Sequence, residues 1–232
     1  MSDRRVVAFV SAAELGPALA HLIASRAEKT LSSGAGYFSL GLSGGSLVSI
    51  LSKELPVVPN LDCSRWLSQL FSKLNIPEDR VLVIDPSLPV QACAEDYASR
   101  LRKAFDTQQT PVFDMLLLGM GPDGHTCSLF PDHPLLQEKQ KTVAPISDSP
   151  KPPPQRVTLT LPVVNAAHCV VFVSTGSSKA PVLKQVLEGG DGEILPAALV
   201  SPTQGELFWL VDEPAAASLT RDVERPGPGA KL

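Results

Sequence analysis

The feature that most constrains the fold is an alternation of short apolar runs with longer helix-like segments along all 232 residues. Continuous apolar runs separated by helices are typical of parallel strands whose two faces are both covered. The predicted fold class is therefore α/β, with a mainly parallel sheet and helices on both faces. The predicted strands are residues 5–10, 37–42, 81–85, 112–118, 169–174, 197–200 and 206–211.

Two helices can be placed between these strands. A capping-box pattern at Ser11 opens the first, but Pro17 would remove a backbone hydrogen bond inside it. We expect that helix either to begin later than its cap indicates or to bend at Pro17. Tyr97, Leu101 and Phe105 repeat at helical spacing, which predicts a helix that covers the core.

The rest of the chain indicates a single domain. Residues 156–161 alternate polar with apolar side chains, which predicts a strand with one wet face. Residues 147–155 are rich in Ser and Pro, and 225–232 are rich in Pro and Gly, so both are predicted to lack regular structure. Neither is typical of a domain linker. We therefore expect one domain over residues 1–232, with a disordered tail at 225–232.

Composition excludes several function classes. The 20 basic and 24 acidic side chains give a net charge of −4, which offers no basic field for nucleic acid. No stretch approaches the ~18–20 apolar residues of a membrane span. The four cysteines are dispersed without C-x-x-C spacing, so neither a zinc site nor a disulfide framework is expected. This cysteine usage favours a reducing, cytoplasmic compartment.

The first segment with chemical potential is the turn Ser43-Gly44-Gly45-Ser46, which follows a predicted strand and precedes a helix. Glycines let the backbone approach a ligand, and free N–H groups at a helix start favour an anion. The same residues are also typical of a tight turn with a serine N-cap. The turn lacks the Walker lysine and a complete G-x-G-x-x-G, so a nucleotide is not the expected ligand.

The second segment runs from Gly119 to Pro131, where a buried strand ends in a turn with three glycines, an acid and a histidine. Because ligands bind at the carboxyl ends of strands in such sheets, this turn and the Ser43 turn could face one crevice. Histidine suits proton transfer near neutral pH. The glycines leave space around His125, and Asp123 could orient its ring. The other histidines, His21, His133 and His168, are expected to cap helices or to face water.

The third segment comprises Arg156 and Lys179. Arg156 follows a proline-rich stretch, and Lys179 lies in the first turn of a predicted helix. A cation there is disfavoured by the helix dipole, and a bound anion would relieve the mismatch. A solvent-exposed lysine is the alternative explanation.

Taken together, these motifs resemble the 6-phosphogluconolactonases. The matching segments are Leu-Ser-Gly-Gly-Ser at 42–46, Gly-Met-Gly-Pro-Asp-Gly-His-Thr-Cys-Ser-Leu-Phe-Pro at 119–131, Pro-Pro-Pro-Gln-Arg-Val-Thr-Leu-Thr at 152–160 and Thr-Gly-Ser-Ser-Lys-Ala at 175–180. The resemblance implies a Rossmann-like fold shared with the glucosamine-6-phosphate deaminases. It also implies hydrolysis of 6-phosphoglucono-δ-lactone in the oxidative pentose phosphate pathway, without a metal or organic cofactor.

The resemblance also implies roles for individual residues. His125 is similar to the residue that activates water, and Asp123 to its supporter. Arg156 and Lys179 resemble phosphate ligands beside the 43–46 turn. The remaining expected substrate-binding residues lie in the histidine turn: Gly121, Gly124 and Thr126. The expected partner is a small phosphorylated sugar lactone, and the chain is expected to be a monomer.

One part of the family pattern is absent. The family has a strand that ends in an Asp-Glu-Arg motif, whereas here Leu61 to Trp66 begin that strand and run directly into the next helix-like segment. We expect one strand to be missing after residue 66, through excision of a contiguous segment. The loss predicts unpaired backbone groups at about 1–3 kcal/mol each if buried, and a pocket that lacks an arginine and an acid.

Three functions remain open at this point. The first is the lactonase, active or weakened. The second is a related sugar-phosphate isomerase or deaminase, which would need a base for a carbon-bound proton. The third is a catalytically inactive shortened variant that at most binds sugar phosphate. The His125 segment favours the lactonase.

Overall fold

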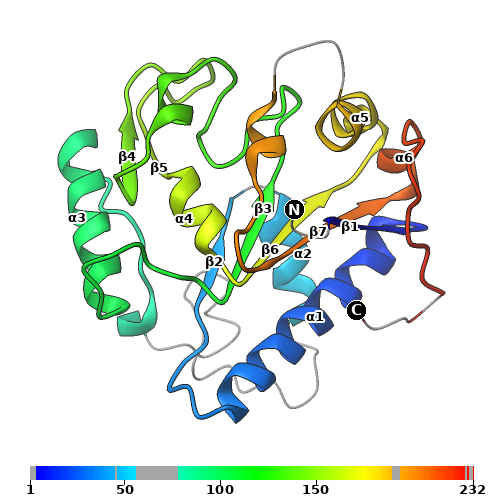
Figure 1. The fold of residues 1–232 in the computed structure, drawn as a ribbon, viewed down its shortest axis with the longest axis horizontal. Coiled ribbons are helices and arrows are strands. Elements are labelled where there is room, and N and C mark those ends of the chain that lie inside the picture. The colour runs from blue at the N-terminus through cyan, green and yellow to red at the C-terminus, as the bar shows by residue number, and fades with distance from the viewer. Residues whose placement is uncertain (1–3, 45, 56–77, 190–193, 228, 230–231) are drawn as a thin grey trace.

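The structure is a computed structural model, and it describes residues 4–44, 46–55, 78–189, 194–227, 229 and 232. Within these residues a five-stranded parallel sheet has the order β1-β7-β6-β3-β2. Figure 1 shows this sheet through the middle of the molecule. Its strands are β1 (Arg4–Phe9), β7 (Glu206–Asp212), β6 (Cys169–Ser174), β3 (Met115–Gly119) and β2 (Leu40–Leu42). The predicted α/β class is confirmed.

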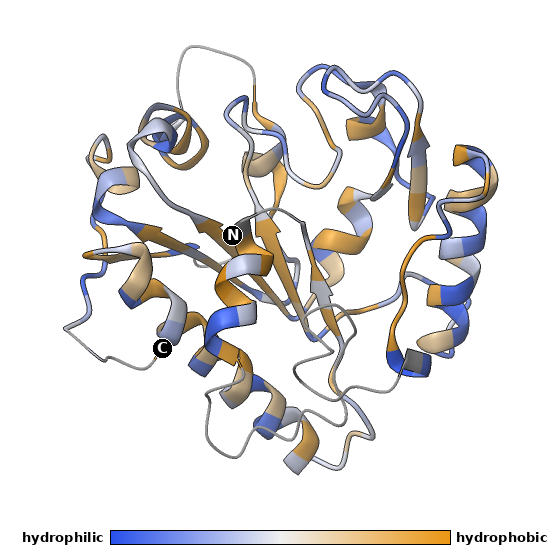
Figure 2. Ribbon diagram, turned by 180° about the vertical axis from the view of Figure 1, so that it is seen from behind, coloured by the Kyte–Doolittle hydropathy of each residue, from blue (hydrophilic) through white to orange (hydrophobic). Residues whose placement is uncertain are grey.

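Helices cover both faces of the sheet. Side chains alternate along each strand, so that Leu116 and Leu118 of β3 enter one core while Met115 and Leu117 enter the other. The second core is closed by α1 (Ala12–Ser32) and α2 (Ser46–Glu54). The first is closed by α3 (Val90–Ala104), α4 (Leu161–Ala166), α5 (Ala180–Glu188) and α6 (Glu213–Ala216). Figure 2 shows hydrophobic strands enclosed by helices with mixed faces.

Short elements complete the fold. A two-stranded antiparallel sheet joins β4 (Val143–Ile146) to β5 (Arg156–Leu159) and packs beside α3. The 3-10 helices are η3 (Glu78–Arg80), η4 (Pro134–Gln137), η5 (Ser177–Lys179) and η6 (Pro196–Leu199). Because β2, β3 and β6 are parallel, the turns that follow them all leave the same edge of the sheet, as Figure 1 shows.

The strands predicted at 5–10, 169–174 and 206–211 are confirmed with shifts of one residue at most. The strands predicted at 37–42 and 112–118 are shorter or displaced, as β2 and β3. The strand at 156–161 is found as β5, which pairs outside the main sheet.

Two predicted strands are wrong. Residues 81–85 form no strand, and Val83 and Ile84 are 52% and 42% exposed. An apolar run becomes a strand only where a neighbouring strand pairs with it, and β2 ends the described sheet order on its side. Residues 197–200 belong largely to η6, where Pro196 opens a 3-10 turn. The strand stub expected between 61 and 68 lies outside the described residues.

Helix α1 begins at Ala12 and runs through Pro17 without interruption, so the prediction of a later start is wrong. Pro17 costs one backbone hydrogen bond, but Leu15, Leu19 and Ile23 are fully buried around it. Tertiary burial outweighs the local cost. On the surface of α3, Asp96 and Arg100 are four residues apart and form an ion pair at 3.5 Å.

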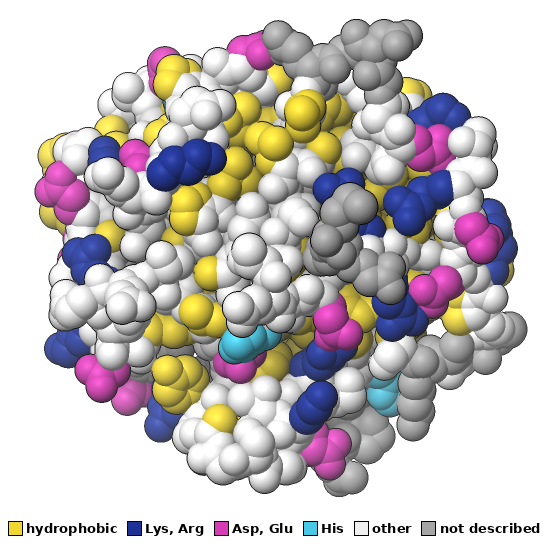
Figure 3. Space-filling model, in the orientation of Figure 1, with side chains coloured by type: hydrophobic (Ala, Val, Ile, Leu, Met, Phe, Trp, Pro, Cys, Tyr) yellow, Lys and Arg dark blue, Asp and Glu magenta, His cyan; other side chains and the backbone are white. Residues whose placement is uncertain are grey.

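The surface carries both signs of charge. Figure 3 shows Lys and Arg side chains interspersed with Asp and Glu over the face in view. Among the described residues, no helix combines the length and the apolar character needed to cross a bilayer.

Candidate active site

The candidate site lies where β2, β3 and β6 end. Lys179 Nζ in η5 donates to the carbonyl oxygen of Met120 at 2.8 Å, which joins the turns after β6 and β3. Ser43 N–H donates to the carbonyl of Leu117 at 2.9 Å, which holds the Ser43 turn against β3. No hydrogen bond in the described part of the chain joins the Ser43 turn to His125. Gly45 lies outside the described residues, and Gly44 is exposed with open space around its Cα.

The histidine turn owes its shape to two glycines. Gly121 N–H donates to the carbonyl of His125 at 2.8 Å, and Gly124 N–H donates to the carbonyl of Gly121 at 3.1 Å. A Cβ on Gly121 would lie 2.0 Å from His125 Nδ1, so only glycine fits there. Gly124 has φ +76°, and a Cβ would lie 2.7 Å from Leu195. These amide groups bond within the turn, so the glycines position His125 rather than offer N–H groups to a ligand.

His125 and Asp123 form a hydrogen-bonded pair. His125 Nδ1 lies 2.6 Å from Asp123 Oδ1, and the His125 side chain is 17% exposed. The ring of Phe130 lies 4.7 Å from the imidazole, centroid to centroid, and covers one side of it. Among the described residues no group bonds to His125 Nε2. With Nδ1 turned to the carboxylate, Nε2 is the nitrogen that can accept a proton.

Lys151 completes this group, and sequence reasoning missed it. Its Nζ lies 2.8 Å from Asp123 Oδ2, the oxygen that His125 does not use. Partial burial raises the pKa of the Asp123 carboxyl, but the hydrogen bonds from Lys151 and His125 outweigh burial and lower that pKa to about 2. Lys151 lies between Pro150 and Pro152 in the proline-rich stretch, and a cation held between prolines there was the signal that could have found it.

Arg156, a predicted phosphate ligand, is brought next to the site at the start of β5. Its guanidinium donates to the carbonyls of Lys151, Pro152 and Pro153 at 2.8–3.1 Å. It also lies over the Phe130 ring, with Cζ 5.4 Å from the centroid. Nε and Nη2 are therefore engaged with the 151–153 backbone. No hydrogen bond from Nη1 is found in the described part of the chain.

Lys179 is held in the site by its surroundings. Burial, and after it the positive charge of Lys151, lowers the pKa of the Lys179 ammonium, and Asp123 partly opposes the shift. Gly176, with φ +91°, begins the turn that carries Lys179, and its N–H donates to both carboxylate oxygens of Asp212. An ammonium that loses solvent gains from a bound anion, as the sequence predicted for Lys179.

Two neighbouring residues do not face a ligand. Thr126, a predicted substrate-binding residue, is fully buried, and its hydroxyl donates to the carbonyl of Gly119 at 3.0 Å. Burial raises the pKa of the Cys127 thiol to about 11, so it stays protonated at neutral pH and is not a nucleophile. Both residues support the turn from inside. In the described part of the chain, no three His, Cys, Asp or Glu side chains are placed to hold a metal ion.

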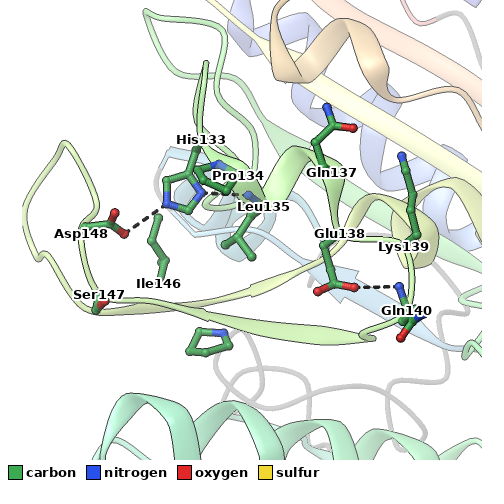
Figure 4. Close-up of a pocket in the computed structure, with 11 residues that line it drawn as sticks. His133, Pro134, Leu135, Gln137, Glu138, Lys139, Gln140, Ile146, Ser147 and Asp148 are labelled. Atoms are coloured by element: carbon green, nitrogen blue, oxygen red, sulfur yellow. Dashed lines mark hydrogen bonds and ion pairs between the residues drawn. The ribbon is translucent and has the colours of Figure 1, made fainter.

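A separate groove of about 580 Å³ lies between η4 and β4, as Figure 4 shows. His133 Nδ1 accepts from the N–H of Leu135 at 3.2 Å, and its Nε2 lies 3.1 Å from Asp148. Of the two roles expected for His133, capping a helix or facing water, the structure shows the first, at the start of η4. The groove does not include His125 or Asp123. Because both ring nitrogens of His133 are engaged, the chemistry points to the histidine turn and not to this groove.

Comparisons with known proteins show which family the chain resembles in sequence and in fold. Residues 64–209 match the family model described as glucosamine-6-phosphate isomerases/6-phosphogluconolactonase. The 6-phosphogluconolactonase of Homo sapiens is 55% identical over 243 residues, covering 94% of each chain, and that of Bos taurus is 50% identical over 250 residues, covering 97% of each. The "devB protein" crystal structure has a TM-score of 0.79 at 27% identity, covering 94% of this chain and 100% of that one. The 6-phosphogluconolactonase of Trypanosoma brucei has the same fold, with a TM-score of 0.80 at 23% identity, covering 95% of this chain and 100% of that one.

The alignments also bear on the expected excision. Ninety-four per cent of 232 residues is about 218, so about 25 of the 243 positions aligned with the human protein have no residue in this chain. That shortfall agrees with a missing internal segment, whose predicted junction near Trp66 lies outside the described residues. The human and bovine matches cover most of both chains at half identity or more. The chain therefore belongs to the glucosamine-6-phosphate isomerase/6-phosphogluconolactonase family.

Proposed function

We propose that this chain hydrolyses 6-phosphoglucono-δ-lactone to 6-phosphogluconate in the oxidative pentose phosphate pathway. The observation that carries the proposal is the Asp123–His125 pair at 2.6 Å, to which Lys151 adds a contact with Asp123 and next to which Lys179 bonds to Met120. The half-identical relatives named 6-phosphogluconolactonase support the same substrate. The partner is then a small phosphorylated sugar lactone.

His125 serves as the general base in this reaction. Water adds to the lactone carbonyl carbon while its proton passes to His125 Nε2, and Asp123 holds the ring through Nδ1. The bond from the carbonyl carbon to the ring oxygen then breaks, and the proton on Nε2 passes to that oxygen. The product is an open-chain hydroxy acid, which ionises at neutral pH. Neutral imidazole is regenerated.

Lys179 and Arg156 anchor the distal phosphate with the Ser43 turn. Lys179 Nζ donates one of its three hydrogens to Met120, which leaves two for a phosphate or a developing oxyanion. Arg156 can offer Nη1 while its other nitrogens hold the 151–153 backbone. Fixing the phosphate orients the lactone for attack.

Hydrolysis fits the site better than isomerisation or deamination. Those reactions need a base for a carbon-bound proton. With a pKa of about 2, the Asp123 carboxylate is a weak base, and both of its oxygens are engaged. Hydrolysis, in which His125 takes a proton from water, does not require a carboxylate base. The geometry therefore favours the lactonase among the family's reactions.

The direct test is lactone loss above its spontaneous rate. We expect the unmodified chain to accelerate the loss, and His125→Ala to reduce the enzymatic rate by about 10²–10⁴-fold, the usual contribution of a general base. His168→Ala is the matched control, because His168 is exposed at the amino end of β6. His133 is a poorer control because its ring caps η4. Equal rates for His125→Ala and the parent would contradict the assignment, and no rate above background in the parent would favour the inactive variant.

The phosphate site has its own test, in which 6-phosphogluconate should raise the melting temperature by mass action. Lys179→Ala and Arg156→Ala should abolish the rise, and Lys141→Ala, an exposed lysine, should keep it. An undiminished rise in both site variants would remove those residues from the phosphate site. We also propose that the chain is monomeric and cytoplasmic, and light scattering of the purified protein tests the first statement.

A further inference from the structure

The Asp123 carboxylate is shared between a cation and the imidazole. Its Oδ1 lies 2.6 Å from His125 Nδ1, and its Oδ2 lies 2.8 Å from Lys151 Nζ. We propose that Lys151 is a positioning residue that sets the lower pH limit of the reaction by compensating the charge of Asp123. The inference rests on the proposed function, because it assumes that His125 must be neutral to accept a proton from water.

The physical reason is competition for one negative charge. A carboxylate beside an imidazole stabilises the imidazolium, which is the inactive form of a general base. Lys151 binds the same carboxylate and so weakens that stabilisation. Asp123 can then orient the ring through Nδ1 without trapping it in the protonated form.

Two further cations lie in the segments next to the histidine turn. Lys179 approaches from η5 and bonds to Met120, next to Gly121. Arg156 approaches from β5 and lies over Phe130, whose other neighbour is the imidazole. Among the described residues, Asp123 is the one carboxylate paired with these groups. Lys151, Lys179 and Arg156 are thus three cations near one carboxylate.

The loop that carries Lys151 is built to hold it in place. Ser149 Oγ donates to the carbonyl of Lys151 at 2.7 Å and accepts from its N–H at 3.3 Å. Arg156 Nη2 donates to the same carbonyl at 3.0 Å. The backbone of Lys151 is thus fixed from both sides, although residues 147–155 form no helix or strand. A surface lysine chosen at random has no such support.

The pair has little to contribute to stability. The side chains of Lys151 and Asp123 are 34% and 31% exposed, and ion pairs this open to solvent usually contribute little to folding stability. A purely structural role would therefore be weak. This separates the proposal from a general effect on folding.

The primary test is an NMR titration of the His125 ring, which reports protonation whether or not the protein is active. In Lys151→Met the titration midpoint should move upward by roughly 0.5–1 pH unit, because the Asp123 charge is no longer compensated. Lys151→Arg should leave the midpoint near that of the parent. His125→Asn identifies the ring signals, and unchanged midpoints of His21 and His168 serve as internal controls.

The kinetic test follows from the same variants. In Lys151→Met, the acid limb of the pH profile of kcat/KM should move to higher pH together with the titration midpoint. The rate on the alkaline plateau should fall only a few-fold. In the Asp123→Asn background Lys151 has lost the carboxylate that holds it beside the ring, so its removal should move the limb and the midpoint less than it does in the parent. An unmoved midpoint in Lys151→Met would overturn the proposal, as would the same shift without Asp123. If the titration shifts but no variant hydrolyses lactone, the proposed function fails and the electrostatic assignment stands.

Discussion

At the scale of single residues, the site depends on a glycine at position 121, because any side chain there would collide with the catalytic pair. Gly121 packs so closely on the Asp123–His125 pair that a Cβ would lie 2.0 Å from Nδ1 and 2.6 Å from the carboxylate. Neither group can retreat freely, because the carboxylate is held by Lys151 and the ring is covered by Phe130. The sequence shows a glycine here but not which atoms occupy the space it leaves.

Gly121→Ala should therefore separate the pair. We expect the enzymatic rate to fall by at least about 10²-fold, comparable with loss of the general base, because His125 loses its orientation. Gly36→Ala is the control, since nothing lies within 4 Å of a Cβ at that position and its φ is not positive. A parent-like rate in Gly121→Ala would show that the pair has room to move.

Asp123 predicts a pH dependence of stability. The pKa of its carboxyl in the folded protein, about 2, is below the ordinary value near 3.9, so its stabilisation is present above about pH 4 and is lost as the pH falls toward 2. Urea unfolding should show a larger free energy of unfolding for the parent than for Asp123→Asn at pH 6, and this difference should shrink below pH 4. The difference should be small, because the pair is partly exposed. A difference in unfolding free energy that grows as the pH falls would contradict the predicted direction of the pH dependence.

At the scale of elements, the site is assembled from turns held by buried caps. Asp212 ends β7, caps α6 through the N–H of Ala215 at 2.9 Å, and binds the N–H of Gly176. It is 6% exposed. One carboxylate thus fixes a helix start and the turn that carries Lys179, so stability and phosphate binding are coupled at this position.

Asp212→Ala should affect both properties. It leaves buried N–H groups unpaired and removes a cap, at about 1–3 kcal/mol, which corresponds to a fall of roughly 2–10 °C in melting temperature for a domain of this size. The KM for lactone should also rise. Asp222→Ala, at an exposed position, should change neither quantity. A lower melting temperature with an unchanged KM would show that the Lys179 turn does not need this support.

At the scale of the whole molecule, the chain is shorter than the human relative that it matches. The human relative aligns about 25 positions that this chain lacks, and β2 is the last strand of the described sheet order on its side. The exposed apolar side chains of Val83 and Ile84 lie in a segment that was expected to be a strand. The shortfall agrees with the predicted excision near Trp66, a position that lies outside the described residues.

Restoring the segment should therefore stabilise the fold. Insertion of the corresponding human residues after Trp66 should raise the melting temperature by several degrees and increase kcat/KM. The reason is that backbone N–H and C=O groups at the sheet edge would then bond to a neighbouring strand. A glycine- and serine-rich insertion of the same length is the control and should do neither. Equal melting temperatures for the two insertions would mean that the shortened chain has already compensated for the loss.

The sequence alone was sufficient to predict the α/β class, three strands of the main sheet, and the His125 turn. Those features are local: they depend on apolar periodicity, glycine spacing and a motif within one continuous segment. The capping role of His133 was likewise predictable, because a histidine beside a proline-led turn needs only near neighbours.

Tertiary structure decided the rest. Whether residues 81–85 and 197–200 become strands depends on a pairing partner and on Pro196, and whether α1 tolerates Pro17 depends on burial of its apolar face. Lys151 comes within 2.8 Å of Asp123 although 28 positions separate them in the printed sequence. Arg156 turns its guanidinium onto the backbone that carries that lysine. Such contacts arise from how loops of distant strands meet at one edge of a sheet, and no local pattern encodes that meeting.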